Sequence, residues 1–328
     1  MTVALRDGTS DPDRLELEGR VALVTGGSKG LGKAYALALG AAGATVAVAA
    51  RSADLLDETC DALERIGRRA MAVRLDVTNE RAVARGVTKV EDTFGSIDLL
   101  VNCAGIMAPI GRDWEVDAGA WWRTMEVNVF GAFHCWQAVL PGMIARRRGR
   151  IINISSSAIY KKYPFYSAYG ASKAALSHAS ASLADATREF GIQVFSYSPG
   201  FVRTAMTEAL ADAPVVRNFL RDGFRRALDE GRTTPVERSA AMLLLLARGD
   251  VDALTGHHID VGDDLGALAE RARVPLGARE TEQLVLGEIG GGPAHDAELE
   301  LRALGDVEQT VASVGEAQHP EQSHIVVR

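Results

Sequence analysis

Cysteine is scarce in this sequence, and its few copies are widely spaced. The chain of 328 residues contains three, Cys60, Cys103 and Cys135. An odd number of thiols without metal-ligand spacing argues against a disulfide framework and against a zinc site. We therefore expect a cytoplasmic protein that binds no metal.

Long apolar runs are missing as well. Hydrophobic residues make up 47% of the chain, yet no window approaches the ~18 uninterrupted apolar residues of a membrane-spanning helix. The first residues also lack the basic stretch and the following apolar stretch of a secretion signal. The composition predicts a globular chain with a full core, in one large domain or two small ones, that does not associate with a membrane.

A surplus of positive charge is the third absence. The net charge is −7, and residues 270–328 hold 11 of the 43 acidic residues but only 5 of the 36 basic ones. That segment therefore carries −6, and the other 269 residues carry −1. Because nucleic-acid binding depends on basic side chains that neutralise phosphates, we exclude nucleic acid as a partner.

Changes in composition divide the chain into three parts. Residues 1–17 are polar and are predicted to be an N-terminal leader, and residues 18–268 form the predicted folded domain. Residues 269–328 are acidic and lack aromatic side chains, but three pieces alternate like strands, at 283–289, 298–304 and 324–327. We expect this extension to be weakly ordered or docked on a partner. One hypothesis is that it crosses to a neighbouring subunit and covers part of the functional site.

Within the folded domain, short apolar segments alternate with segments of helical spacing. Strands are predicted at residues 21–24, 44–50, 70–77, 98–103, 151–154, 193–198 and 257–261. One long helix is predicted over residues 118–145, and Pro141 should kink or stop it. This alternation predicts right-handed βαβ units. The expected fold class is α/β, a three-layer doubly wound Rossmann fold with a seven-stranded parallel sheet.

A glycine-rich turn follows the first predicted strand and opens a helix. Residues 25–32 read Thr-Gly-Gly-Ser-Lys-Gly-Leu-Gly, with glycines at Gly26, Gly30 and Gly32. Glycines let the backbone turn tightly and approach a pyrophosphate, which then lies at the N-terminus of the helix. The alternative is an ordinary turn between a strand and a helix.

The end of the second strand bears on which dinucleotide binds. A cofactor without a 2′-phosphate usually meets an acidic residue there, whereas this chain has Arg51 followed by Ser52. Lys29, inside the glycine-rich turn, can reach the same place. Two cations suit a phosphate dianion, so we predict that NADPH is preferred over NADH. The alternative is that both cations are solvated surface residues.

A pair on a later helix can move a proton. Tyr169 and Lys173 are four residues apart and lie on one helical face. A phenol titrates near ~10, and a nearby ammonium can lower that pKa by roughly 1–3 units. Ser156, just after a predicted strand, can donate a hydrogen bond to a substrate oxygen beside the phenol. This arrangement suits proton transfer to and from a C–O bond.

Together these features resemble the short-chain dehydrogenase/reductase family, in its compact single-domain branch. The resemblance spans about residues 17–261 and includes the spacing of 13 residues that selects Ser156 from three adjacent serines. Its landmarks are residues 25–32, Asp76-Val77, residues 102–105, Asn128, Ser156, Tyr169 with Lys173, and Pro199-Gly200.

The resemblance implies a role for each landmark. Tyr169 would be the general acid/base, Lys173 would lower its pKa and hold the nicotinamide ribose, Ser156 would orient the carbonyl, and Asn128 would support a water path. The implied cofactor contacts are Gly26, Ser28, Lys29, Gly30, Leu31, Gly32, Arg51, Ser52, Asp76, Val77, Asn102, Ala104, Gly105, Tyr169, Lys173, Pro199, Gly200, Val202 and Thr204.

The resulting hypothesis is an NADP(H)-dependent ketoreductase or secondary alcohol dehydrogenase that forms a homodimer or homotetramer. Its substrate would be a medium-sized or bulky, mostly apolar carbonyl compound, held by residues 106–109, 158–166 and 201–202 under a lid after Thr204. One alternative uses the same groups for imine reduction, epimerisation or cyclisation. Another is a catalytically silent NADP-binding regulator, which would be expected to have lost part of the set Asn128, Ser156, Tyr169 and Lys173.

Overall fold

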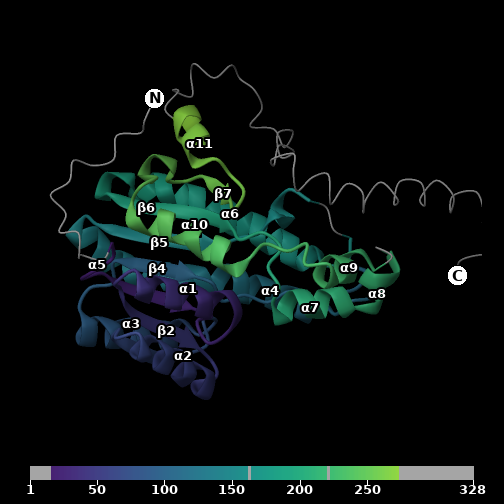
Figure 1. Cartoon of the computed structure of the whole chain (residues 1–328), viewed down its shortest axis with the longest axis horizontal. Coiled ribbons are helices and arrows are strands. Elements are labelled where there is room, and N and C mark those ends of the chain that lie inside the picture. Colours follow the sequence, from purple (N-terminus) through teal and green to yellow (C-terminus); the bar gives the residue numbers. More distant parts are fainter. Residues whose placement is uncertain (1–15, 162–163, 220–221, 273–328) are drawn as a thin grey trace, which may run out of the picture.

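The computed structural model describes residues 16–161, 164–219 and 222–272 (Figure 1). The strands are β1 Val21–Thr25, β2 Thr45–Ala50, β3 Ala70–Arg74, β4 Leu99–Asn102, β5 Gly149–Ile154, β6 Ile192–Ser198 and β7 His258–Asp260. The helices are α1 Gly30–Ala41, α2 Ala53–Arg65, α3 Glu80–Phe94, α4 Ala118–Met125, α5 Gly131–Arg146, α6 Ser167–Thr187, α7 Ala205–Asp212, α8 Pro214–Phe219, α9 Gly223–Asp229, α10 Val236–Arg248 and α11 Leu265–Ala272.

The strands form one seven-stranded sheet in the order β3-β2-β1-β4-β5-β6-β7. Every pairing is parallel. The predicted fold class is therefore confirmed. The strand order reverses between β1 and β4, and ligands of such sheets bind outside the carboxyl ends of the strands at that point.

Each face of the sheet has its own hydrophobic core. In β1, Ala22 and Val24 pack into one core, and Val21 and Leu23 pack into the other. This alternation follows from the two-residue period of a strand. The first core is completed by side chains of α1, α2 and α10, and the second by side chains of α3, α5 and α6. Figure 1 shows the sheet enclosed between these helices.

The long helix predicted over residues 118–145 is interrupted in a place that the sequence did not suggest. A π-helical turn, Glu126–Phe130, separates α4 from α5. Pro141 lies inside α5 and does not stop it, since the helix continues to Arg146. Val139 and Met143, on either side of the proline, are buried in the second core. Their packing stabilises the helix past the missing N–H bond.

The connection after β6, residues 201–232, contains three short helices, α7, α8 and α9. They lie together at one end of the molecule, at the right in Figure 1. Leu210 of α7 and Val216 of α8 are buried beside Tyr169 in a third, smaller cluster. The apolar positions of this connection therefore cover the predicted functional residue.

Both ends of the described chain pack against the first core. The N–H of Leu17 donates to the carbonyl of Ala42 at 2.8 Å, and Leu265 and Leu268 of α11 contact the same core. The predicted domain boundary at residue 268 thus falls inside α11. The three strand-like pieces predicted in residues 273–328 lie outside the described residues. Across the parts described, no helix is both long and apolar enough to span a membrane.

Candidate active site

The carboxyl ends of β1, β4, β5 and β6 bring four loops to one edge of the sheet. The glycine-rich turn follows β1, residues 103–111 follow β4, Ser156 follows β5 and Pro199 follows β6. The turn and the last loop approach each other, because a Cβ added to Gly30 would lie 4.0 Å from Cγ2 of Thr204.

The glycine-rich turn depends on its glycines for geometry. Gly26 has a φ of 68°, and a Cβ there would lie 2.9 Å from Cα of Ala104. A Cβ on Gly32 would lie 2.2 Å from the carbonyl oxygen of Gly26. The N-cap residue of α1, Lys29, makes no side-chain bond to the first helical turn. The free N–H groups at this helix start suit an anion such as a pyrophosphate.

Lys29 and Arg51 are exposed beside this turn. Within the described part of the chain, neither makes a hydrogen bond or a close ion pair, although the charge of Arg51 acts on the Asp76 carboxylate. Ser52, the N-cap residue of α2, also makes no side-chain bond to its helix. Two exposed cations and a hydroxyl that does not cap its helix fit a ribose phosphate, so the residues present fit an NADP-type dinucleotide.

Asp76 and Val77 follow β3 in a fixed position. The Asp76 carboxylate accepts from the N–H and the hydroxyl of Thr78 at 2.9 and 2.8 Å, and it pairs with Arg123 of α4 at 3.3 Å. Burial raises the pKa of Asp76, but the Thr78 hydrogen bonds and the charges of Arg123 and Arg51 outweigh it, and the pKa is lowered. The site therefore presents Asp76 as a carboxylate.

The side chain of Asn102 is used inside the protein. Its Nδ2 donates to Oδ1 of Asn153 at 2.9 Å, and the Trp136 indole donates to the same oxygen at 3.1 Å. Asn153 in turn donates to Ser180 of α6 at 2.9 Å. Asn102 thus ties β4 to β5 and α6. Ala104 and Gly105 lie in the loop beyond it, close to the glycine-rich turn.

Asn128 lies in the π-helical turn and is almost fully buried. Its Oδ1 accepts from the N–H of Ile106 at 2.8 Å, and its Nδ2 donates to the carbonyl of Ile106 at 2.9 Å. The same Nδ2 donates to Ser172 of α6 at 2.9 Å. Asn128 therefore joins the loop after β4 to the helix that carries Tyr169, and π-turns are frequent at such functional positions.

Ser156, Tyr169 and Lys173 meet at the carboxyl end of β5. Ser156 forms a hydrogen bond with Tyr169, and its Oγ accepts from the N–H of Ala158 at 3.1 Å. Nζ of Lys173 lies 5.6 Å from the centre of the Tyr169 ring and donates to the carbonyl of Ile154 at 2.7 Å.

The pKa values of this pair differ from the prediction. Burial raises the pKa of Tyr169 to about 12, and the hydrogen bond from Ser156 offsets part of that effect. Burial lowers the pKa of Lys173 to about 8. The predicted lowering of the Tyr169 pKa by Lys173 is therefore not found in this structure, because both groups are desolvated and the ammonium is bonded to Ile154.

The segment from Pro199 to Thr204 leads into the lid helices. Gly200 has a φ of 76°, and a Cβ there would lie 2.2 Å from Oγ1 of Thr234. Thr204 caps α7, and Thr207 reciprocates by accepting from the N–H of Thr204 at 2.8 Å. The Thr207 hydroxyl also donates to the carbonyl of Val202 at 2.9 Å. These bonds fix Val202 and Thr204 relative to α7.

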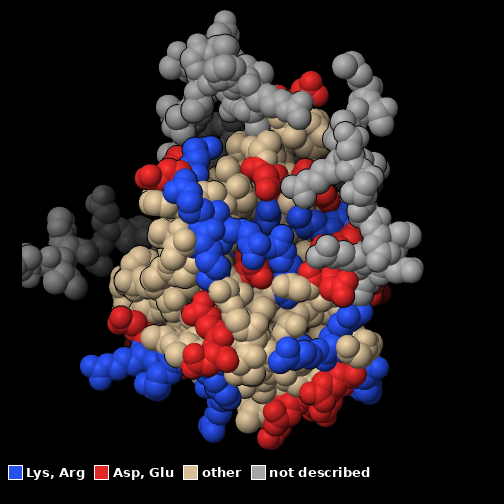
Figure 2. All heavy atoms as spheres, turned by 90° about the vertical axis from the view of Figure 1, so that its left-hand side faces the viewer, with Lys and Arg blue, Asp and Glu red and all other residues tan. Residues whose placement is uncertain are grey.

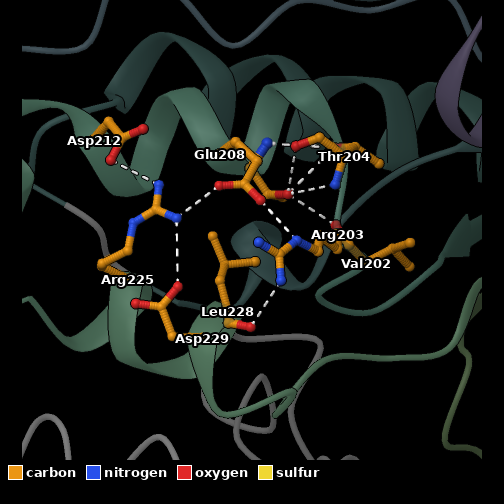
Figure 3. A network of polar contacts seen from close by, with 9 residues as sticks. Val202, Arg203, Thr204, Glu208, Asp212, Arg225, Leu228 and Asp229 are labelled. Atoms are coloured by element: carbon orange, nitrogen blue, oxygen red, sulfur yellow. Dashed lines mark hydrogen bonds and ion pairs between the residues drawn. The ribbon is translucent and has the colours of Figure 1, made fainter.

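A network of charged side chains joins α7 to α9 (Figure 3). Glu208 pairs with Arg203 at 2.7 Å and with Arg225 at 2.8 Å. Arg225 also contacts Asp212 at 2.6 Å and Asp229 at 3.6 Å. The network connects the loop after β6 with both helices, so it holds α7 and α9 in a defined arrangement.

The lid and the loop before α6 form an apolar wall beside Tyr169. The buried members are Ala158, Tyr166, Tyr169, Leu210 and Val216. Met107, Ile110, Phe165, Met206, Ala213, Val215 and Phe224 pack against them. Three of the four segments predicted to form the pocket therefore contribute to one cluster.

Some residues that organise the site were not predicted. Thr25 Oγ1 accepts from the N–H groups of Cys103 and Ala104 at 3.1 and 3.2 Å, and so aligns the loop after β4. Arg123 and Ser172 act similarly on Asp76 and Asn128. The sequence contains one signal for such supporting residues, which is a polar residue inside an otherwise apolar strand. Thr25 and Asn153 show this signal.

A parallel sheet with a glycine-rich turn at its switch point, and a Ser-Tyr-Lys group beside it, defines a dinucleotide-dependent oxidoreductase. The model of the short chain dehydrogenase family matches residues 20–214. The chain therefore belongs to the short-chain dehydrogenase/reductase family, as its sequence predicts.

Similar proteins agree with this assignment. A short chain dehydrogenase of Pseudocercospora fijiensis is 33% identical over 289 residues, which cover 85% of this chain and 93% of the relative. Gluconate 5-dehydrogenase of Burkholderia cenocepacia, solved with NADP and tartrate, is 29% identical with a TM-score of 0.68 over 78% of this chain and 98% of that one. An NAD+-bound xylitol dehydrogenase is 27% identical with a TM-score of 0.68 over 74% and 98%.

Proposed function

We propose that this protein is an NADP(H)-dependent oxidoreductase that interconverts a ketone and a secondary alcohol, with Tyr169 as the general acid/base. The observation that carries the proposal is the meeting of Ser156, Tyr169 and Lys173 between the glycine-rich turn and an apolar wall. The family assignment supports redox chemistry, and this geometry supports a C–O group as its target.

Each residue has a role that follows from its position. The nicotinamide cofactor, when bound, supplies or accepts the hydride. Tyr169 donates a proton to the substrate oxygen during reduction and takes it back during oxidation. Ser156 donates a hydrogen bond to the same oxygen, where negative charge develops. Lys173 adds positive charge beneath the phenol, and Asn128 holds α6 in register with the loop after β4.

The positive charges of Lys29 and Arg51 support a preference for NADP(H). Both NADP and NAD+ occur in the similar structures, so the fold does not select between them. Lys29 and Arg51, which are exposed beside the glycine-rich turn, support a phosphate on the ribose. Ser28, Leu31, Gly105 and Pro199 would line the cofactor through their backbone at the same edge of the sheet.

The apolar wall beside Tyr169 indicates the size and polarity of the substrate. This wall consists of aliphatic and aromatic side chains from the lid and from the loop before α6. It supports a medium-sized or bulky, mostly apolar carbonyl compound. Each Å² of apolar substrate surface that the wall removes from water favours binding by about 25 cal/mol.

The direct test is NADPH oxidation with a panel of ketones that includes cyclohexanone, 1-decalone and a β-keto ester. We expect turnover of the bulkier, apolar members. Tyr169→Phe, which removes one oxygen atom, should lower kcat by on the order of 10²–10⁴ and leave the Kd for NADPH unchanged. Near wild-type turnover in Tyr169→Phe would contradict the proposal, and NADPH binding without any turnover would instead indicate a regulator.

Cofactor preference has its own test. Arg51→Ala should weaken NADPH binding and leave NADH binding unchanged, measured by fluorescence titration with both cofactors. Equal loss for both cofactors, or a wild-type preference for NADH, would contradict the assignment of NADP(H).

Product analysis separates ketone reduction from imine reduction, epimerisation or cyclisation. Three further statements stay predictions. They are that the protein forms a homo-oligomer, that it works in a reducing compartment, and that residues 269–328 cover part of the active site.

A further inference from the structure

A second buried polar cluster lies directly behind the candidate active site. Its centre is His258 of β7, whose side chain is 11% exposed. Nδ1 of His258 lies 2.9 Å from Oγ of Ser196 in β6 and 3.2 Å from Oγ of Ser177 in α6. Ser177 and Ser196 are 2.6 Å apart. One imidazole therefore connects the last two strands with the helix that carries Tyr169 and Lys173.

The cluster continues to the residue that precedes Ser156. Oγ of Ser155 lies 2.9 Å from Oγ of Ser177, and it also donates to the backbone carbonyl of Lys173 at 3.5 Å. The N–H of Ser155 donates to the carbonyl of Tyr197 at 2.7 Å. Ser155 is thus held from α6 and β6 at once, and its position sets where the chain leaves β5.

His258 also contacts the segment that follows Ser156. The ring of Tyr160 meets the imidazole edge-on, with centroids 5.2 Å apart. Tyr160 ends the 3₁₀ turn Ser157–Ile159, which begins with Ser156 as its N-cap residue. Ser156 is therefore bracketed: the residue before it and the turn after it are both connected to the same imidazole.

The other ring nitrogen of His258 faces a carboxylate. Nε2 lies 3.8 Å from an oxygen of Asp260, which is too far for a hydrogen bond, and it has no hydrogen-bond partner among the described residues. The order Asp260, His258, Ser196 resembles a nucleophile triad. However, Ser196 is 1% exposed, so its hydroxyl cannot reach a substrate, and the cluster can act only on the positions of its neighbours.

From these contacts we infer that His258 is a positioning residue for Ser156, acting through Ser177 and Ser155 on one side and through Tyr160 on the other. The inference rests on the proposed function, in which the Ser156 hydroxyl bonds the reacting oxygen beside Tyr169. A loosened Ser156 weakens a bond that matters in the transition state, so its loss acts on kcat more than on cofactor binding.

The test compares two substitutions at one position. His258→Leu removes both ring nitrogens, whereas His258→Asn keeps a polar atom near the place of Nδ1. With NADPH and the best ketone of the panel, we expect His258→Leu to lower kcat about 10-fold, as for a small misplacement of a reacting group, with the Kd for NADPH unchanged. His258→Asn should retain kcat within about 2-fold. His178→Leu, an exposed change on α6, is the matched control.

A second readout does not depend on turnover. Amide hydrogen exchange of the full chain should be faster over residues 154–160 in His258→Leu, normal in His258→Asn, and unchanged over β1 and α1 in both. Ser177→Ala, which removes the central hydroxyl by a one-atom change, should change kcat and exchange in the same direction, and it replaces His258→Leu if that variant folds poorly.

The outcomes separate this inference from the proposed function. Wild-type kcat and exchange in His258→Leu would overturn the inference, and so would an equal loss in His258→Leu and His258→Asn, because that would indicate packing alone. Tyr169→Phe is measured in parallel. Full activity of Tyr169→Phe contradicts the proposed function, whereas an inactive Tyr169→Phe beside an unaffected His258→Leu contradicts only the role of His258.

Discussion

Tyr169 and Lys173 are each nearly excluded from solvent, and burial opposes the charged form of both side chains. The raised pKa of Tyr169 keeps the phenol protonated at neutral pH, as a proton donor requires. The lowered pKa of Lys173 means that its ammonium is held in the protein at a cost in stability. Such perturbed groups are common at functional sites, and the cost itself can be measured.

Lys173 should make the free energy of unfolding depend on pH. Its pKa is about 8 in the folded protein and 10.5 ordinarily. Between these values the unfolded chain binds more protons, so stability rises with pH. Below about pH 8 Lys173 is protonated in both states, so the folded protein bears the full free-energy cost of burying the ammonium charge. Lys173→Met should therefore be more stable than wild type by about 1–3 kcal/mol at pH 7.

Urea unfolding at pH 7 and at pH 9.5 measures this effect. The stability difference between Lys173→Met and wild type should shrink at the higher pH. Lys89→Met, at an exposed position of α3, should show no such dependence. Tyr169 does not contribute to the pH dependence of stability at pH 7 or pH 9.5, because its raised pKa affects stability only above about pH 10. The same difference at both pH values would contradict the assigned burial of the ammonium charge.

Gly26 and Gly19 allow backbone strain to be separated from close packing. Both have a left-handed φ, 68° and 76°, but only Gly26 has Ala104 at 2.9 Å from the place of a Cβ, whereas Gly19 faces open space. Gly19→Ala should cost about 1 kcal/mol through strain alone. Gly26→Ala should cost more and should also weaken NADPH binding. Equal stability losses with unchanged binding would show that the close approach is unimportant.

At the scale of elements, the lid combines a small apolar cluster with several ion pairs. The helices α7, α8 and α9 are short, and a helix of one or two turns is not stable by itself. Their arrangement depends on the small apolar cluster beside Tyr169 and on the Glu208 network (Figure 3). Arg225 is central to that network, since it contacts three carboxylates and is 22% exposed.

Arg225→Ala should loosen the lid and raise the KM for the ketone several-fold, while the Kd for NADPH changes little. Stability should fall slightly, because the ion pairs that join α7 to α9 are lost. Arg217→Ala is the matched control, because Arg217 pairs only with Asp222 at the surface among the described residues. Steady-state kinetics with both variants is the measurement. An unchanged KM in Arg225→Ala would mean that the lid does not need the network.

The π-helical turn is the element that the sequence pattern could not predict. The helical period of apolar residues runs through residues 118–145, and a turn with one extra residue leaves the pattern almost unchanged. Only the tertiary contacts of Asn128, with Ile106 and Ser172, show why the helix widens there. The widening directs the amide toward α6.

At the scale of the whole molecule, charges of both signs are mixed over one face of the surface (Figure 2). Figure 2 shows Lys and Arg side chains interleaved with Asp and Glu on the face at the left of Figure 1. At the amino ends of the strands, Asp98 pairs with Arg20 and Arg148, and Arg150 pairs with Asp252. This mixture agrees with the near-zero net charge of residues 1–269, which argued against nucleic acid.

The face of α4 and α5 is the best candidate for contact with a second copy of the chain. Trp122, Phe130 and Phe133 are 51%, 45% and 44% exposed there, and clustered exposed aromatics indicate interaction sites. We expect a homodimer or homotetramer by light scattering. Phe133→Glu should shift the mass toward the monomer, whereas Ile66→Glu, at an exposed apolar residue after α2, should not. A monomeric wild type would contradict the prediction.

The sequence by itself determined the order of strands and helices, the parallel sheet and the identity of the Ser-Tyr-Lys group. The order of the elements and the sheet depend on local periodicity and on glycine positions, which are written along the chain, whereas the Ser-Tyr-Lys group was predicted from the resemblance to the short-chain dehydrogenase/reductase family. Tertiary structure alone decided the pKa shifts of Tyr169 and Lys173, the contacts on both sides of Ser156 and the arrangement of α7, α8 and α9. Burial and hydrogen bonding join residues as distant as Ser155, Ser177 and His258, and such distances in sequence carry no periodic signal.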